Sequence, residues 1–235
     1  MKIHRFIGLF SFSAKTTIID DGDTVHQIKN VLRLRPGEII ALCSSENEQE
    51  AQCKIVSYEG KKVLCEVQSV TQNTKEFDIP LVLYCSILKK ENFEWVVQKA
   101  TELGVTEIYP LMCERTIKLG VRADRLQKIA KEAAEQSGRA RVPDIKAPIE
   151  LQDAFLKNGY DIKLFFDELG DKVKEKNFIK KSIALFIGPE GGWAPEEIEN
   201  AKKAGCQIVS LGKTILRAET AATVAVFWTI QNSAL

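Results

Sequence analysis

The sequence predicts a small β-barrel domain followed by a larger α/β domain built on a parallel sheet. Short apolar runs separated by polar turns fill about the first 70 of the 235 residues, as in a small barrel. Beyond a polar stretch at residues 70–76, strand-like runs alternate with stretches of helical period, which indicates a parallel sheet covered by helices on both faces. We therefore predict one domain at residues 1–70 and a second at residues 71–235.

In the first domain, four apolar runs predict strands, at residues 3–8, 38–43, 51–58 and 62–70. Residues 24–32 have the pattern of a short helix, with Asp23 or Thr24 as its cap. The turn that follows carries two guanidinium groups, those of Arg33 and Arg35.

The second domain begins with a continuous apolar run at residues 80–88, which is typical of a strand buried on both faces. Apolar residues then recur at helical spacing over residues 93–103, and Gly104 ends that helix. Further strands are expected at 108–113, 162–166, 182–186 and 207–210, and further helices at 122–137 and 151–156. Residues 221–228 are apolar almost all round, so we expect a helix buried against its own sheet or a partner subunit.

Composition excludes several classes of protein. The hydrophobic and charged fractions, 45% and 28%, are those of a soluble globular protein. No apolar run approaches the ~18 residues of a membrane span, and the first residues lack the apolar core of a secretory signal, so we expect a cytoplasmic protein that does not bind a membrane. The six cysteines are scattered and only two histidines accompany them, so we expect reduced thiols and no metal site.

The loop after the strand at 182–186 is poor in side chains. Residues 187–193 read I-G-P-E-G-G-W, and the three glycines would let a flat ligand lie against peptide groups. Pro195 then starts a helix with two acids in its first turn. Taken alone, this stretch fits a ligand-binding loop and an ordinary β-to-α turn equally well.

A second loop, L-G-K-T-I-L-R-A-E-T-A-A at residues 211–222, also follows a strand and opens a helix. Together the two loops resemble the cofactor loops of the SPOUT methyltransferases, and within that superfamily the family that methylates N3 of a uridine in 16S ribosomal RNA. Residues 89–105, 132–143 and 26–37 are similar to further elements of that family, so the resemblance covers almost the whole chain. One departure is Ala194, which stands where a capping side chain is usual.

The resemblance implies a trefoil-knotted α/β domain behind a PUA-like barrel, with S-adenosyl-L-methionine as methyl donor and S-adenosylhomocysteine as product. It implies 16S ribosomal RNA or the small ribosomal subunit as partner, and a homodimer. The expected cofactor-binding residues are Ile187, Gly188, Pro189, Gly191, Gly192, Leu211, Gly212, Ile215, Leu216, Arg217 and Thr220. The expected RNA contacts are Arg5, Arg33, Arg35 and Arg139.

The chemistry of N3 methylation assigns roles to two further side chains. Uridine N3 is a poor nucleophile until its proton leaves, and a fixed cation would stabilise the negative charge that spreads to O2 and O4. Arg217 is our candidate for that cation, although it would equally suit a structural pair with Glu219. Glu219 would either accept the proton or orient Arg217, and we favour the orienting role. Glu102 and Arg139 are further candidates for shaping the target pocket.

Two alternative functions remain open at this stage. A SPOUT enzyme that methylates a ribose 2′-hydroxyl usually carries an N-x-G…R element, where this chain has Glu102-Leu103-Gly104. A non-catalytic RNA-binding assembly factor is the other alternative, and the intact glycine loop argues against it. Residues 115–146 hold nine basic and four acidic side chains, an excess that fits either phosphate binding or a solvated helix face.

Overall fold

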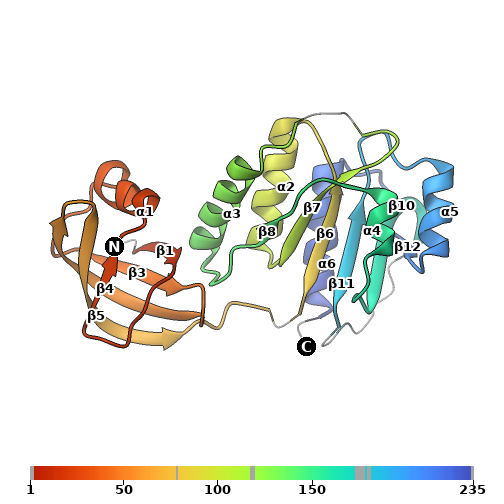
Figure 1. Ribbon diagram of the computed structural model, residues 1–235. Coiled ribbons are helices and arrows are strands. Elements are labelled where there is room, and N and C mark those ends of the chain that lie inside the picture. The colour runs from red at the N-terminus through yellow and green to blue at the C-terminus, as the bar shows by residue number, and fades with distance from the viewer. Residues whose placement is uncertain (1–2, 78, 117–119, 173–177, 179–180, 234–235) are drawn as a thin grey trace. The chain divides into compact units, whose positions relative to one another are not determined.

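The computed structural model describes residues 3–77, 79–116, 120–172, 178 and 181–233, and the chain forms two units (Figure 1). The first unit comprises Met1–Glu76 together with Ala134–Val142, and the second comprises Phe77–Ala133 and Pro143–Leu235. The chain therefore returns to the first unit after it has entered the second.

The first unit is a five-stranded mixed sheet in the order β1-β3-β4-β5-β2. β1 runs parallel to β3, and the other neighbours are antiparallel. The four predicted strands are all present, whereas the four-residue β2 was not predicted. Phe6, Ile19, Ile40 and Leu42 are fully buried and form part of its core. The strands are β1 His4–Gly8, β2 Thr16–Ile19, β3 Ile39–Ser44, β4 Gln49–Glu59 and β5 Lys62–Gln72.

The predicted helix at residues 24–32 begins earlier than expected and changes its winding. It consists of α1, Gly22–His26, and a π-helical turn η1, Gln27–Val31. The prediction that Asp23 or Thr24 caps it was wrong, because Asp21 has the extended backbone of a cap and its Oδ2 accepts a hydrogen bond from the Thr24 N–H at 2.9 Å.

Residues 134–142 join the first unit through buried hydrogen bonds. The Ile7 N–H donates to Glu135 Oε1 at 3.0 Å, and Asn73 Nδ2 donates to the Gly138 carbonyl at 3.0 Å. The carboxylate of Glu76 accepts from the Arg139 guanidinium and from two backbone N–H groups, those of residues 140 and 141. Burial alone would raise the pKa of Glu76, but Arg139 and these N–H groups together hold it below its usual value.

The second unit is a parallel sheet in the order β12-β10-β11-β6-β7-β8, with β9 also pairing with β7. All six residues of β6 and all five of β11 are buried, as the continuous apolar runs predicted. The strands are β6 Leu81–Ser86, β7 Glu107–Met112, β8 Asp144–Ile145, β9 Ile149–Glu150, β10 Ile162–Lys172, β11 Ile183–Ile187 and β12 Gln207–Ser210.

Helices cover both faces of this sheet, with α4 in front and α6 behind in Figure 1. α4 contacts α5 on one side, and α6 contacts α2 on the other. Gly104, at φ 105°, follows α2 as expected. The helices are α2 Lys90–Glu102, α3 Ala123–Ser137, α4 Leu151–Leu156, α5 Pro195–Lys203 and α6 Ala218–Gln231.

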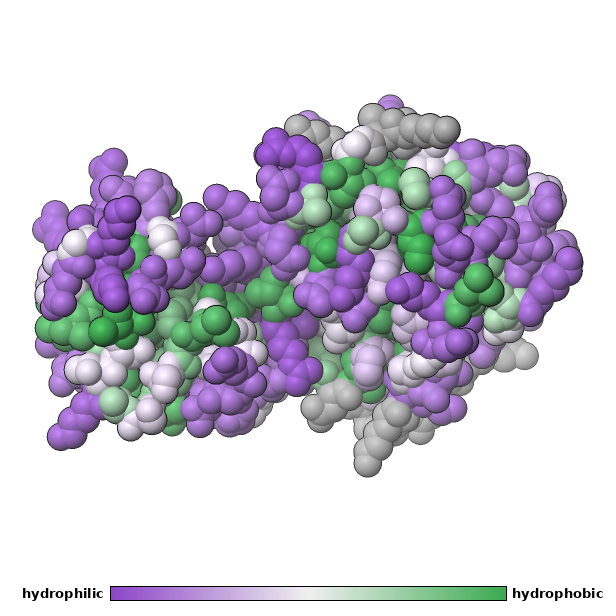
Figure 2. Space-filling view, viewed as in Figure 1, coloured by the Kyte–Doolittle hydropathy of each residue, from purple (hydrophilic) through white to green (hydrophobic). Residues whose placement is uncertain are grey.

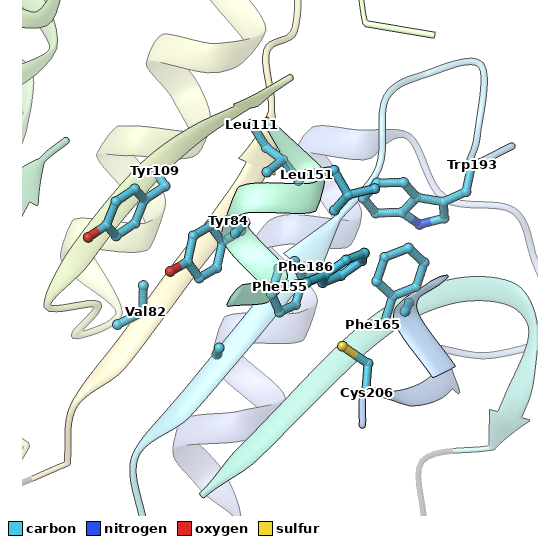
Figure 3. Packing of buried hydrophobic residues seen from close by; sticks show 13 residues of the cluster. Val82, Tyr84, Tyr109, Leu111, Leu151, Phe155, Phe165, Phe186, Trp193 and Cys206 are labelled. Atoms are coloured by element: carbon cyan, nitrogen blue, oxygen red, sulfur yellow. The ribbon is translucent and has the colours of Figure 1, made fainter. Parts of the chain in front are cut away.

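An aromatic cluster fills the α4 side of the sheet (Figure 3). Tyr84 stacks between Tyr109 and Phe186, with ring centroids 4.7 Å apart in both pairs. Phe165 packs against Trp193 at a centroid distance of 4.1 Å. Trp193 belongs to the glycine-rich loop that follows β11, residues 188–194, which we call the glycine loop. That loop is therefore anchored directly in the core.

The predicted architecture is confirmed, because a small sheet domain precedes an α/β domain built on a parallel sheet. The trefoil knot concerns how the chain is threaded rather than which strands pair, and it stays a prediction. Within the described residues, no helix combines the length and apolarity needed to cross a bilayer.

Candidate active site

The glycine loop, residues 188–194, is shaped by the packing of Trp193. A Cβ atom at Gly188 would lie 2.8 Å from Trp193 Cε2, so a side chain there would displace the indole. Trp193 Nε1 donates to the Phe166 carbonyl at 2.9 Å. The Gly192 N–H donates to the Pro189 carbonyl at 2.9 Å, and Gly192 has a φ of 69° that favours glycine. Gly188 and Gly192 are therefore required for the conformation of the loop.

Gly191 has a different role, because its backbone does not require glycine. Among the described residues, a Cβ atom there would meet only Arg115, at an ordinary contact distance of 3.5 Å. A glycine at this position therefore lets the Arg115 side chain lie against the loop and keeps the loop backbone uncovered by a side chain of its own.

The start of α5 is capped from within the helix. Ala194 has no side-chain acceptor, but its N–H donates to Glu197 Oε2 at 2.8 Å. Glu197 Oε1 accepts from the Glu114 N–H at 2.9 Å, and Glu197 is only 7% exposed. The capping loss expected at Ala194 is therefore partly offset by one half of a capping box.

The second loop, residues 211–217, joins β12 to α6 and presents apolar side chains to solvent. Ile215 is 82% exposed and Leu216 is half-buried. Ser210 Oγ donates to the Gly212 carbonyl at 3.0 Å, and Gly212 has a φ of 150°. Because β10, β11 and β12 are parallel neighbours in the sheet, this loop and the glycine loop emerge at the same edge.

Arg217 and Glu219 stand at the start of α6. Arg217 is exposed at the N-cap position, and no ion pair between it and Glu219 is present in the described part of the chain. Glu219 Oε2 is buried and has no hydrogen-bond partner among the described residues. Burial raises the pKa of the Cys85 thiol, and the charges of Cys113, Glu190 and Glu219 raise it further, which indicates that Glu190 and Glu219 lie near the end of β6.

The predicted RNA contacts Arg5 and Arg139 lie in ion pairs within the first unit, and their role in RNA binding stays a prediction. The Arg139 side chain is 3% exposed and pairs with Glu76 at 3.0 Å. The Arg5 side chain is 10% exposed and pairs with Glu50 at 2.7 Å. Both guanidinium groups thus hold an ion pair inside the first unit, although Arg5 Nε is buried and has no hydrogen-bond partner among the described residues. Glu102, expected near the target pocket, pairs with Lys99 at 2.8 Å on α2.

Arg33 and Arg35 are exposed, as an RNA contact requires. Arg33 has a φ of 53°, which a residue with a side chain seldom adopts. Such a conformation persists only where the surrounding structure imposes it, and it is often found at functional sites. Figure 2 shows hydrophilic side chains over much of the visible face of each unit.

A bulge where β10 pairs with β12 was not indicated by any sequence pattern. The register between β10 and β12 shifts between Phe166 and Asp171. A Cβ atom at Gly170 would lie 2.6 Å from the Val209 backbone, so this close approach requires glycine. Leu169, within the bulge, is 85% exposed.

A cavity of about 290 Å³ lies beside the starts of α4 and α5. No residue of the glycine loop or of residues 211–217 lines it, so it is distinct from the predicted cofactor site. The described residues contain no group of three or more His, Cys, Asp or Glu side chains placed to hold a metal ion. The cavity is lined by Met112, Cys113, Glu114, Glu150, Leu151, Gln152, Glu196, Glu197 and Asn200.

Comparisons with known proteins agree with this architecture. Residues 75–230 match the family model of an RNA methyltransferase domain, and residues 19–71 match that of an RNA methyltransferase PUA domain. Ribosomal RNA small subunit methyltransferase E of Bacillus subtilis is 32% identical over 216 residues, covering 85% of this chain and 84% of that protein. The protein of the same name from Rickettsia conorii is 34% identical over 212 residues, covering 86% of this chain and 84% of its own.

Among solved structures, a ribosomal RNA small subunit methyltransferase E from Neisseria gonorrhoeae, bound to S-adenosyl methionine, superposes with a TM-score of 0.85. It is 32% identical, and the match covers 96% of this chain and 95% of that one. The family resemblance carried by the two loops is thereby confirmed, and the chain belongs to the ribosomal RNA small subunit methyltransferase E family.

Proposed function

We propose that this protein transfers a methyl group from S-adenosyl-L-methionine to N3 of a uridine in 16S ribosomal RNA. The observation that carries the proposal is that two loops emerge at the same edge of the parallel sheet, one free of a side chain at Gly191 and the other exposing Ile215. Crevices outside the carboxyl ends of parallel strands are where α/β sheets bind ligands.

The residues present fit the methyl donor. Gly191 leaves space over the glycine loop, and the N–H groups of Glu190 and Gly191 have no acceptor within the described residues. Ile215 and Leu216 offer apolar surface for an adenosyl group, and the backbone at Leu211 and Gly212 offers polar groups. When bound, the donor supplies a methyl group on a sulfonium centre. Excluding water helps that transfer to an anion, since both charges vanish in the transition state.

The roles proposed for Arg217 and Glu219 depend on whether these two side chains form an ion pair with each other. A structural Arg217–Glu219 pair and an orienting Glu219 both require that the two side chains interact, and no such pair is present in the residues described. A buried carboxylate oxygen without a partner needs a donor, and the N3–H group of uracil is one. We therefore assign Glu219 to accepting the N3 proton and Arg217 to stabilising the charge on the uracil oxygens.

Nucleoside analysis tests the proposal against its alternatives. RNA of the small subunit, treated with the protein and a methyl-labelled donor, should yield labelled 3-methyluridine after digestion. Label on a ribose 2′-oxygen would instead support the 2′-O-methyltransferase. Absence of label, with RNA binding retained, would support the non-catalytic assembly factor.

RNA binding is proposed for the exposed turn of the first unit. Arg33→Glu should weaken binding of small-subunit RNA and lower the slope of log Kd against log salt by about 1, because one phosphate contact is lost. The measurement is a fluorescence titration at several salt concentrations. Lys61→Glu, on an exposed turn of the same unit, is the matched charge reversal and should leave the slope nearer to that of the wild type. Equal slopes for Arg33→Glu and the wild type would show that RNA binds at another surface of the protein.

A homodimer is proposed from the exposed apolar surface of α6. Phe227 and Val224 on α6 are 52% and 38% exposed, and Trp95 on the contacting helix α2 is 50% exposed. Surface of this kind is typical of a protein interface, and a second copy is the occupant we propose. Phe227→Glu should therefore give a monomer in light scattering while the wild type is a dimer. A monomeric wild type would refute the proposal, whereas Gln231→Glu, also exposed on α6, should keep the wild-type mass.

A further inference from the structure

The turn after β7, residues 113–116, contacts the glycine loop directly at Gly191 and is linked to its last residue, Ala194, through Glu197 of α5. Arg115 Nη1 donates to the Gly191 carbonyl at 2.9 Å. The Glu114 N–H and the Ala194 N–H donate to the two oxygens of Glu197, at 2.9 and 2.8 Å. The turn and the loop are thus joined at two points within the second unit.

The turn is itself held firmly. The Cys113 N–H donates to Thr116 Oγ1 at 2.8 Å, and the Thr116 N–H donates to the Cys113 carbonyl at 3.0 Å. Thr116 Oγ1 also lies 2.8 Å from Ser86 Oγ, at the end of the central strand β6. Arg115 therefore extends from a fixed base, which a residue that positions another group requires.

Arg115 fixes one end of a peptide whose other end is already fixed. In a trans peptide the carbonyl and the next N–H point in opposite directions. The Gly191 carbonyl is bound by Arg115, and the N–H of the same peptide, on Gly192, is bound by the Pro189 carbonyl. Among the described residues, only Arg115 comes within 4 Å of a Cβ built at Gly191, so its side chain supports this residue.

We propose that Arg115 is a positioning residue of the cofactor site. By holding the peptide between Gly191 and Gly192, it sets the direction of the N–H groups of Glu190 and Gly191, which have no acceptor in the described chain and are available to the methyl donor. A hydrogen bond from a charged donor is stronger than a neutral one, so the guanidinium suits this task. The inference rests on the proposed function, because it takes this loop to be the cofactor site.

The test is calorimetric titration with S-adenosylhomocysteine. Arg115→Ala should raise the Kd about tenfold, equivalent to about 1.4 kcal/mol, and Arg115→Lys should raise it less because the ammonium keeps one charged donor. In turnover assays, Arg115→Ala should raise the KM for S-adenosylmethionine while kcat at saturation changes little. A general loss of stability would not raise KM while leaving kcat unchanged. Arg122→Ala is the matched control, since it removes the same charge from an exposed side chain that pairs with Asp124.

The outcomes are distinct. An unchanged Kd for Arg115→Ala, or an equal rise for Arg122→Ala, overturns the inference and leaves the proposed function intact. A wild-type protein that binds no S-adenosylhomocysteine overturns both. If Arg115→Ala fails to fold, Arg115→Lys is the test of the inference. A Kd and KM equal to those of the wild type in Arg115→Lys would overturn it, because they would show that the guanidinium geometry is not needed.

Discussion

Gly191→Val is expected to abolish cofactor binding while the protein stays folded. The Gly191 backbone does not need glycine, and the atom nearest to an added Cβ is 3.5 Å away, so the fold has room for the change. The branched side chain would press against Arg115, whose guanidinium holds the Gly191 carbonyl, and we expect it to narrow the space over the loop that the methyl donor is proposed to occupy. We expect the Kd for S-adenosylhomocysteine to rise at least about a hundredfold, equivalent to about 2.7 kcal/mol.

Two other glycines provide the controls for this experiment. Gly188→Ala should lower Tm, because its methyl group would lie 2.8 Å from the Trp193 ring and disturb the core. Gly120→Val, with nothing within 4 Å of its Cβ, should change neither Tm nor Kd. Retained affinity in folded Gly191→Val would remove the glycine loop from the cofactor site.

Glu219→Gln is expected to lower kcat by at least about a hundredfold, the usual scale for losing a general base. The substitution keeps the shape of the side chain and removes its ability to accept the N3 proton. The Kd for S-adenosylhomocysteine should stay near that of the wild type, since the proposed task of Glu219 concerns the uracil. Single-turnover methylation of small-subunit RNA, with cofactor binding measured alongside, checks both expectations.

Arg217→Ala should likewise reduce turnover more than cofactor affinity. Glu199→Gln is a suitable control for Glu219→Gln, because Glu199 is an exposed carboxylate paired with Lys202 on α5. Wild-type turnover in Glu219→Gln would contradict its role as base, and wild-type turnover in Arg217→Ala would contradict its role as charge stabiliser.

The strands β6 and β11 of the second unit could be predicted because their apolar runs are long and uninterrupted, whereas the two-residue strands β8 and β9 were not predicted. β6 and β11 are buried on both faces, so almost every residue in them is apolar and the runs are continuous. The glycine loop and residues 211–217 were predicted as a pair from their resemblance to the cofactor loops of the SPOUT methyltransferases, and they do emerge at the same edge of the sheet. Local pattern was sufficient for these elements.

Features that depend on a distant partner could not be predicted. Arg139 has the appearance of an RNA contact in the sequence, and only the folded chain brings Glu76 against it, 63 residues away. The β10 bulge depends on how close Val209 comes to Gly170. Arg115 was one of nine basic residues in a stretch, and nothing in its neighbours indicated that its guanidinium reaches Gly191.

Residues 134–142 also govern how this protein can be divided. A fragment that stops at Glu76 would leave a buried carboxylate without Arg139 and without its two backbone donors, and it would leave the Ile7 N–H without Glu135. Uncompensated groups of this kind are costly to bury. The sheet of the first unit therefore cannot be excised by cutting the chain after Glu76. Exchanging this unit between relatives would require two grafts, the second taken from the end of α3.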